Sequence, residues 1–335
     1  METGLSDEQY MSRCLTLAAH GRRSCAPNPM VGAVIVCNGK IIGEGYHIRA
    51  GEPHAEVNAI NAVKDKTLLK DSTIYVSLEP CSHYGRTPPC AELIIKMGIP
   101  RVVVGCQDPF PEVSGRGIRM LRAKGIIVKV GVLEAQCLYL NRRFITFFTK
   151  NRPYVTLKWA QSQDGFIDRK REVNEPASVI STKRSSLLSH KHRTENQAIL
   201  VGKNTVLMDN PSLTARLWYG TNPVPIVLGD KMTLPKSLIL MQPNSSKTPL
   251  PLFYGRQPMV QLMESLYANK IQTLLVEGGT KIHQWFFASD CWDEAWIEIS
   301  PLIIHQGVEA PILPANVKKE ICSVMGAKYL HITRI

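Results

Sequence analysis

The sequence lacks any long apolar run, and no stretch approaches the ~20 residues that a membrane-spanning helix requires. Its first twenty residues, METGLSDEQYMSRCLTLAAH, begin with polar and acidic side chains, unlike a secretory signal. We therefore expect no membrane partner and a cytoplasmic location. Structural disulfides are disfavoured in that reducing compartment. Most of the nine cysteines are accordingly expected to be small buried residues.

Internal repeats, low-complexity tracts and an arginine-rich arm are also missing. There is no G-x-G-x-x-G motif, which argues against a Rossmann dinucleotide site. The formal net charge of +12 nevertheless favours an anionic partner. On charge alone, nucleic acid, a membrane surface and a phosphorylated small molecule would each qualify.

The composition is that of a folded globular protein, because 44% of the residues are hydrophobic and 20% are charged. A chain of 335 residues exceeds what one hydrophobic core usually organises, so two domains are expected. A helical pattern over 133–153 is stopped by Pro153, and a strand pattern follows immediately. We therefore expect one domain over 1–150 and a second over 151–335.

Short β-branched strands alternate with helical patterns in both halves, which predicts a mixed three-layer α/β architecture. The strands expected in the first half are 31–36, 41–46, 73–78, 101–105 and 126–131, with helices over 54–64, 88–98 and 115–125. The strands expected in the second half are 154–160, 198–202, 224–229, 273–279 and 295–300. Helices are expected there over 181–194, 258–269 and up to about 288, and the proline-rich 235–258 is interpreted as connecting loops.

Three side chains have the chemistry of a zinc site: His54 in GEPHAEVNAI, and Cys81 and Cys90 in SLEPCSHYGRTPPC. Catalytic zinc is commonly held by three such nitrogen and sulfur ligands, with water in the fourth position. His54 and Cys90 are each expected near a helix N-terminus, where the partial positive charge also lowers the pKa of a thiol. His83 is expected to be a loop residue, because a fourth protein ligand would displace the water.

Glu56 lies two residues after His54, on the first turn of the predicted helix, where it can face the water without binding the metal. Zinc lowers the pKa of bound water to about 7, and a carboxylate can then act as base and afterwards as acid. Zinc nucleobase deaminases carry H-x-E followed by P-C-x-x-C. HAE and EPC match that pattern, but eight residues separate Cys81 from Cys90 instead of two. A structural zinc site is the alternative, although it gains nothing from Glu56.

The segments PNPMVGAVIV, GEPHAEVNAI and EPCSHYGRTPPC together resemble the bifunctional deaminase–reductase of riboflavin biosynthesis, in which the eight-residue spacer is characteristic. DPFPEVSGRGI (108–118) resembles a further family segment, with Phe110 where asparagine is usual. The resemblance covers essentially the whole chain, more loosely after residue 150. It implies a cytidine-deaminase-like α/β domain followed by a dihydrofolate-reductase-like α/β domain, with Zn²⁺ and NADPH as cofactors.

For the first domain, the resemblance implies hydrolytic removal of the 2-amino group of 2,5-diamino-6-(5-phosphoribosylamino)pyrimidin-4(3H)-one. His54, Cys81 and Cys90 match the family's zinc ligands, and Glu56 matches its proton shuttle. Asn28 and His47 lie in matching motifs and are expected to shape the base pocket. A loop-capping amide and a surface imidazole are the alternative interpretations of these two residues.

For the second domain, the resemblance implies NADPH-dependent reduction of the ribose of the deaminated product to a ribityl chain. The matching stretches are GKNTVLMDNPSLTAR (202–216) and LLVEGGTKIHQWF (274–286). By position, the cofactor contacts would be Gln161, Thr205, Asp209, Gly278, Gly279 and Thr280, and the substrate contacts would be Arg193, Leu213, Arg216 and Glu277. Arginine pairs suit a phosphate because each guanidinium donates two parallel hydrogen bonds, although solvent-facing arginines are an alternative.

The second half also departs from the family, because Ala177 and Val179 occupy places where serine and tryptophan are common. Two other functions are compatible with parts of the pattern: a zinc deaminase that edits nucleic acid and carries an accessory α/β domain, and a zinc-stabilised binding protein without turnover. The long spacer, the arginine pair and the missing nucleic-acid motif favour a small-molecule enzyme. We expect it to act as a homo-oligomer on a phosphorylated pyrimidine, with no nucleic-acid partner.

Overall fold

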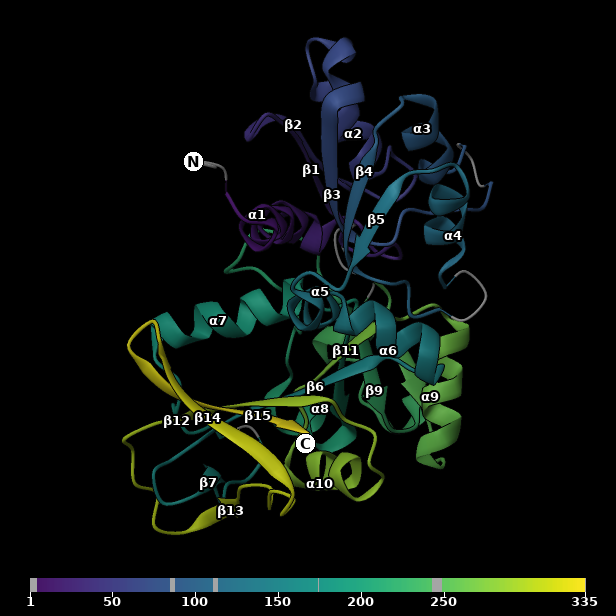
Figure 1. The fold of residues 1–335 in the computed structure, drawn as a ribbon. Coiled ribbons are helices and arrows are strands. Elements are labelled where there is room, and N and C mark those ends of the chain that lie inside the picture. The colour runs from purple at the N-terminus through teal and green to yellow at the C-terminus, as the bar shows by residue number, and fades with distance from the viewer. Residues whose placement is uncertain (1–4, 85–87, 111–113, 174, 243–248, 335) are drawn as a thin grey trace. The chain divides into compact units, whose positions relative to one another are not determined.

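The computed structural model describes residues 5–84, 88–110, 114–173, 175–242 and 249–334 (Figure 1). The chain divides into two compact units, residues 1–150 and 151–335. Each unit has a mixed β-sheet with helices packed against it, which confirms the predicted α/β class.

The first unit is built on a five-stranded sheet with the order β2-β1-β3-β4-β5. Its strands are β1 (Gly32–Cys37), β2 (Lys40–Tyr46), β3 (Ser72–Leu78), β4 (Arg101–Cys106) and β5 (Ile127–Val130). Strand β1 is antiparallel to both of its neighbours, whereas β3, β4 and β5 run parallel. Asn38 and Gly39 form the tight turn between β1 and β2, and both have positive φ, as a two-residue hairpin of this twist requires.

Helices cover both faces of this sheet, which gives the three layers (Figure 1). The helices are α1 (Asp7–Ala19), α2 (Ala55–Ala62), α3 (Cys90–Lys96), α4 (Arg116–Ala123), α5 (Glu134–Leu140) and α6 (Arg142–Lys150), with short 3₁₀ turns at His20–Arg23 and Lys66–Asp71. The apolar side chains of α2, α3 and α4 pack on one face, and those of α1 and α5 pack on the other. Strand β1 is buried along its whole length for this reason.

The prediction of one helix over 133–153 is wrong, because α5 and α6 are separate helices that meet at Asn141. The Asn141 side chain accepts a hydrogen bond from the Met30 amide (2.8 Å) and donates one to the Met30 carbonyl (2.9 Å). Asn141 has φ −95° and ψ 12°, outside the α-helical range, and these two hydrogen bonds fix its side chain on a distant segment. The break therefore follows from a long-range contact and not from the local sequence.

The second unit is built on an eight-stranded sheet with the order β10-β9-β8-β11-β6-β12-β15-β14. Its strands are β6 (Tyr154–Gln161), β8 (Ala198–Gly202), β9 (Val224–Leu228), β10 (Leu252–Tyr254), β11 (Thr273–Val276), β12 (Glu294–Ile299), β14 (Val317–Val324) and β15 (Ala327–Arg334). The first six strands in the sheet order run parallel to one another. Strand β15 is antiparallel to both of its neighbours, β12 and β14. Strands β7 (Phe166–Arg169) and β13 (Gly307–Glu309) form a separate pair.

The helices of this unit are α7 (Lys183–Thr194), α8 (Lys203–Asp209), α9 (Met259–Ala268) and α10 (Thr280–Ala288), with 3₁₀ turns at Lys231–Thr233 and Ile239–Met241. Helices α9 and α10 bury apolar side chains against one face of the sheet. The ring centroid of His192 on α7 lies 5.5 Å from that of Trp296 of β12, and Trp296 stacks on His331 of β15 with centroids 4.2 Å apart. The layer beneath α7 is therefore polar and aromatic, in contrast to the apolar opposite face.

Several details of the second half differ from the prediction, which also did not include helix α8 or strands β7 and β13. The strand expected over 273–279 ends at Val276, so that its last residues form a strand–helix loop. The proline-rich segment contains strand β10 in addition to loops. The β14–β15 hairpin was not predicted; its turn at Met325 and Gly326 has positive φ at both residues but lacks the usual Asn-Gly signal.

Candidate active sites

The three candidate zinc ligands lie at the ends of three elements of the first unit. His54 is the N-cap residue of α2, Cys90 is the first residue of α3, and Cys81 follows β3 by three residues. Two hydrogen bonds join Cys81 to the start of α3, since the Cys90 amide donates to Cys81 Sγ at 3.3 Å and the Ala91 amide donates to the Cys81 carbonyl at 3.2 Å. The fold therefore gathers ligands that are far apart in the sequence.

The spacing of the donor atoms fits zinc. His54 Nδ1 lies 3.6 Å from Cys81 Sγ and 3.4 Å from Cys90 Sγ, and all three ligand atoms lie within 4.8 Å of one another. In a tetrahedral site, bonds of about 2.3 Å to sulfur and about 2.0–2.1 Å to nitrogen place these atoms about 3.6 Å apart. His83 is exposed and is not a member of this cluster. Within the described residues, this cluster therefore offers three ligand atoms, one from each side chain.

The local electrostatics favour a thiolate and a proton carrier. Hydrogen bonds from Cys90 and His54 lower the pKa of the Cys81 thiol to about 4. The Glu56 side chain is 3% exposed, and burial raises its pKa to about 7, with a further contribution from Cys81. A metal cation beside Glu56 would act in the opposite direction and lower that pKa. Glu56 is therefore a buried carboxyl, placed on the first turn of α2 next to the ligands.

Asn28 and His47 lie in direct contact, with Asn28 Nδ2 3.0 Å from His47 Nε2. His47 Nδ1 lies 3.2 Å from the Pro53 carbonyl, so Nδ1 carries the ring proton and donates it to that oxygen. The other ring nitrogen, Nε2, therefore accepts a hydrogen bond from the Asn28 amide group. Burial lowers the pKa of His47, which favours this neutral form. The His47 ring also packs edge-on against His54 at 5.4 Å. These contacts place both predicted pocket residues beside the ligand cluster.

Two residues that support this site were missed by the sequence reasoning. Asn141 holds the loop that carries Asn28 through its two hydrogen bonds to Met30. Glu79, in the motif EPC, is buried and accepts hydrogen bonds from four backbone amides, those of Asp108, Gly115, Gly117 and Ile118. Glu79 thereby joins the Cys81 loop to the start of α4. Residues 111–113 of the DPFPEVSGRGI segment lie outside the described residues.

In the second unit, the predicted residues gather at the carboxyl ends of three adjacent parallel strands, β8, β11 and β6. Gln161 ends β6, Gly202 ends β8, and Glu277 follows β11. Open parallel sheets bind ligands in this position, outside the carboxyl ends of their strands. The Glu277 amide donates to the Leu200 carbonyl at 3.0 Å, which keeps the two strand ends together.

The Gly278–Gly279 pair connects β11 to α10, and the two glycines have different roles. A Cβ atom at Gly278 would lie 2.7 Å from Ile282 Cβ, so only glycine allows α10 to pack this close to the strand. A Cβ atom at Gly279 would meet no atom within 4 Å, so open space adjoins the start of α10. The amides of the first helical turn have no partner within their own helix. This junction fits the pyrophosphate of a dinucleotide, and the adjacent Thr280 hydroxyl donates to the Glu309 carbonyl.

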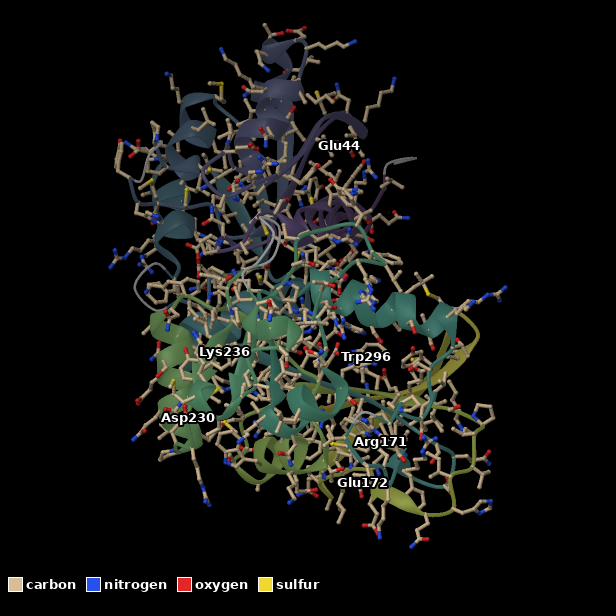
Figure 2. The ribbon with its side chains drawn as sticks, turned by 180° about the vertical axis from the view of Figure 1, so that it is seen from behind. Glu44, Arg171, Glu172, Asp230, Lys236 and Trp296 are labelled. Carbon is tan, nitrogen blue, oxygen red and sulfur yellow. The ribbon has the colours of Figure 1, made fainter. Side chains whose placement is uncertain are left out.

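Thr205 and Asp209 lie on α8, directly after β8. The Asp209 carboxylate is already ion-paired through Oδ1 with Arg171, a buried guanidinium labelled in Figure 2. Arg171 also donates to Asp168 (2.5 Å) and to the carbonyls of Glu175 (3.0 Å) and Met208 (3.2 Å). The sequence reasoning missed Arg171, since only the fold brings these groups together.

The predicted substrate residues occupy neighbouring positions in the same unit. Arg193 on α7 forms a two-fold ion pair with Glu277, and its Nη1 atom donates to the Thr214 carbonyl at 2.9 Å. Arg216 is exposed and reaches the Ser212 hydroxyl at 3.1 Å. Leu213 is 3% exposed and packs into an apolar cluster, so a ligand could reach its backbone more readily than its side chain.

Lys158 of β6 adds a third positive group that the sequence reasoning did not single out. Burial lowers the pKa of Lys158, opposed by the carboxylates of Glu277 and Glu298. Lys158 therefore belongs to a charged layer that includes Arg193 and Glu277. In the sequence, Lys158 is one charged residue within a strand pattern, and nothing there indicated that it would lie near Arg193 and Glu277.

Comparison with known families identifies both halves of the chain. The cytidine and deoxycytidylate deaminase zinc-binding region matches residues 5–106, and the RibD C-terminal domain matches residues 153–320. The riboflavin biosynthesis protein RibD of Bacillus amyloliquefaciens is 36% identical and covers 98% of this chain and 94% of its own length. The chain belongs to the RibD family. The RibD protein of Aquifex aeolicus is 39% identical, over 90% of this chain and 89% of its own.

Solved structures of RibD proteins have the same fold. A diaminohydroxyphosphoribosylaminopyrimidine deaminase/5-amino-6-(5-phosphoribosylamino)uracil reductase from Thermotoga maritima is 34% identical with a TM-score of 0.87, and covers 98% of this chain and 99% of its own. RibD of Acinetobacter baumannii is 29% identical with a TM-score of 0.86, over the same shares. As a RibD family member, the chain is a bifunctional enzyme of riboflavin biosynthesis with a deaminase and a reductase domain, and its cofactors are Zn²⁺ and NADPH.

These findings confirm the predicted family, fold class, function and cofactors, and they do not favour a nucleic-acid-editing enzyme. Within the described part of the chain, every helix is too short or too polar to cross a membrane.

Proposed function

We propose that the first unit deaminates 2,5-diamino-6-(5-phosphoribosylamino)pyrimidin-4(3H)-one and that the second unit reduces the ribosyl group of the product. The observation that carries the proposal is the cluster of His54, Cys81 and Cys90, whose ligand atoms lie within 4.8 Å of one another. Buried Glu56 adjoins it on the first turn of α2. A purely structural metal site has no use for that carboxyl.

In the deaminase, His54, Cys81 and Cys90 would hold the zinc ion. The ion, when bound, lowers the pKa of a coordinated water so that hydroxide is available at neutral pH. Glu56 accepts the water proton and delivers it to the departing amino group, acting first as base and then as acid. Asn28 is held by His47 through one amide hydrogen, which leaves its carbonyl oxygen to accept a hydrogen bond from the pyrimidine.

In the reductase, the cofactor would contact Gln161, Thr205, Asp209, Gly278, Gly279 and Thr280, and the substrate would contact Arg193, Leu213, Arg216 and Glu277. NADPH, when bound, supplies the hydride that reduces C1′ of the ring-opened sugar. The adjacent strand ends support this assignment, because they bring both groups of residues to one edge of the sheet. The protein's contribution is to bind and orient the two ligands.

The proposal is tested by mass spectrometry of the diaminopyrimidine substrate after incubation with the zinc-loaded enzyme, with and without NADPH. We expect ammonia release and the deaminated product without NADPH, and the ribitylamino product only when NADPH is added. Deaminated product without any NADPH oxidation would refute the reductase half alone. An unchanged substrate in both reactions would refute the deaminase half, and the reductase half would then be tested with directly supplied deaminated product.

We also propose that the enzyme acts in the cytoplasm as a homo-oligomer on a phosphorylated pyrimidine and not on nucleic acid. The net charge of +12 suits an anionic substrate. Strand β14 is at the edge of its sheet and exposes 70% of Ile321, a feature that suits pairing with a second copy. Sedimentation equilibrium tests the assembly, and a monomer at micromolar concentration would contradict it. Filter binding over a salt series tests for nucleic acid.

A further inference from the structure

His190 is a buried histidine of α7 that the proposed mechanism does not use. It lies three residues before Arg193, so both side chains are on the same side of the helix. The residue is 5% exposed. Within the described residues, its Nδ1 atom has no hydrogen-bond partner. A buried ring nitrogen without a partner is uncommon and calls for an explanation.

The surroundings of His190 are those of an anion site. The ring is hydrogen-bonded to the Thr214 backbone, and Arg193 donates to the carbonyl of the same residue at 2.9 Å. The hydroxyls of Ser212 and Thr214 lie 3.2 Å apart in the same loop, within 3.1 and 3.5 Å of Arg216 Nη1. The loop from Ser212 to Arg216 thus contributes two hydroxyls and one guanidinium group. Helix α7 adds the guanidinium group of Arg193 and the imidazole of His190, which both contact Thr214.

The charged groups that act on His190 are Arg193 on its own helix, Arg216 in the facing loop and Glu277 after β11. Burial lowers the pKa of His190 to about 4, and the two arginines contribute to that shift. The ring is therefore neutral near pH 7. A neutral imidazole has one N–H donor and one acceptor nitrogen. Because the Thr214 carbonyl takes the donor, Nδ1 is the acceptor.

A phosphate dianion offers only acceptors, so it cannot contact neutral Nδ1 unless one proton lies between them. We propose that His190 is a phosphate-binding residue of the reductase and that the substrate phosphate binds together with one proton at the His190 Nδ1 position. This inference rests on the proposed reductase function and adds a third group to the arginine pair. The proton is taken up from the solution on binding and is shared between the ring and the phosphate.

The test is calorimetric titration of the full-length zinc-loaded enzyme with ribose 5-phosphate at about pH 8, where the phosphate is a dianion because its second pKa is about 6. Titrations in two buffers of different ionisation enthalpy give the number of protons taken up. For the wild type we expect uptake close to one proton per phosphate bound. His190→Gln retains a donor for Thr214 but cannot be protonated, so uptake should vanish and binding should weaken by at least about tenfold.

His192→Gln removes another buried imidazole from the same helix and is the matched control, in which proton uptake should persist. Ribose without phosphate should give no uptake. Wild-type binding without uptake, uptake that persists in His190→Gln, or no wild-type binding at millimolar ribose 5-phosphate would each overturn the role of His190. NADPH oxidation by the same wild-type preparation with authentic deaminated substrate shows separately whether the reductase function itself holds.

Discussion

Arg193 and Glu277 form a two-fold ion pair, with Nε 3.2 Å from Oε1 and Nη2 2.6 Å from Oε2. Both side chains are largely buried, at 15% and 13% exposure. The ion pair with Arg193 lowers the pKa of Glu277 although burial opposes it. Two residues assigned to substrate binding are therefore also partners of one another, and the site is partly assembled before a ligand arrives.

Arg193→Gln should destabilise the second unit by about 3 kcal/mol, because a buried carboxylate loses its partner. Arg216→Gln, at an exposed position, should change stability by less than about 0.5 kcal/mol. Both should raise the KM for the phosphorylated substrate about tenfold to a hundredfold, as expected for a lost charge-assisted contact. All five tryptophans lie in residues 151–335, so tryptophan fluorescence in urea follows this unit alone. Equal stability losses in the two variants would contradict the assignment.

Removing any one zinc ligand should abolish metal binding and deamination together. Cys81→Ser, Cys90→Ser and His54→Ala should each contain less than half an equivalent of zinc by elemental analysis, because three ligands are the minimum for a catalytic site. NADPH oxidation with directly supplied deaminated product should be retained. His83→Ala is the matched control, and its zinc content should equal that of the wild type. Unchanged zinc in His54→Ala would exclude it as a ligand.

Glu56→Gln should retain zinc and fold but lose deamination by at least about 100-fold, the lower range for a general acid–base residue. The amide keeps the size of the buried side chain but cannot carry the proton. Glu52→Gln, on an exposed loop before α2, provides a control for a changed charge nearby. Ammonia release by the Glu56 variant within threefold of wild type would assign proton transfer to another group.

Asn141→Ala should raise the deaminase KM and destabilise the first unit by about 1–3 kcal/mol, since two backbone groups of Met30 lose their partner. The loop that carries Asn28 would no longer be fixed, so binding of the base should suffer more than zinc content. Asn61→Ala, on the exposed side of α2, is the control. Calorimetric melting and substrate saturation curves measure the two effects. A normal KM in a clearly destabilised Asn141 variant would limit Asn141 to a structural role.

The sequence predicted the ligand chemistry of the first unit better than the contacts that support it. His54 and Glu56 share one helix turn, and the two cysteines occur in one motif, so local spacing was enough to select the three candidate ligands that the fold brings together. Asn141 and Glu79 act on backbone groups up to 111 residues away in the chain, and such contacts leave no local pattern. The helix break at Asn141 was missed for the same reason.

In the second unit, the order of the strands in the sheet determines which distant residues lie together, and this order could not be predicted from the sequence. The residues that we propose for cofactor and substrate binding are dispersed over 161–280, and the adjacent strands β8, β11 and β6 bring their segments to one edge of the sheet. The buried strand β8 was predicted with its observed bounds from its continuous apolar run, whereas β11 was predicted to begin correctly at Thr273 but to end three residues too late. Lys158 and Arg171 were missed, because a single charged residue in a strand or loop has no distinguishing spacing.

Arg171→Met should weaken NADPH binding without affecting deamination. Methionine occupies much of the volume of the arginine stem but makes none of its hydrogen bonds to Asp168, Glu175, Met208 and Asp209. In the wild type, Arg171 binds Oδ1 of Asp209 and thereby fixes the carboxylate that we propose contacts the cofactor. Without that ion pair, Asp209 and the loop beside it lose their fixed position, so the KM for NADPH should rise at least about tenfold.

Lys170→Met changes an exposed neighbour with the same loss of charge and should leave the KM for NADPH unchanged. Asp209→Asn separates the two roles of the pair: if Asp209 contacts the cofactor, this variant should raise the KM for NADPH even though Arg171 is intact. Should Arg171→Met raise the KM while Asp209→Asn leaves it within threefold of wild type, Arg171 acts through the loop and Asp209 is not a cofactor contact. Initial rates of NADPH oxidation with saturating deaminated substrate distinguish these cases, because only the cofactor concentration is then limiting.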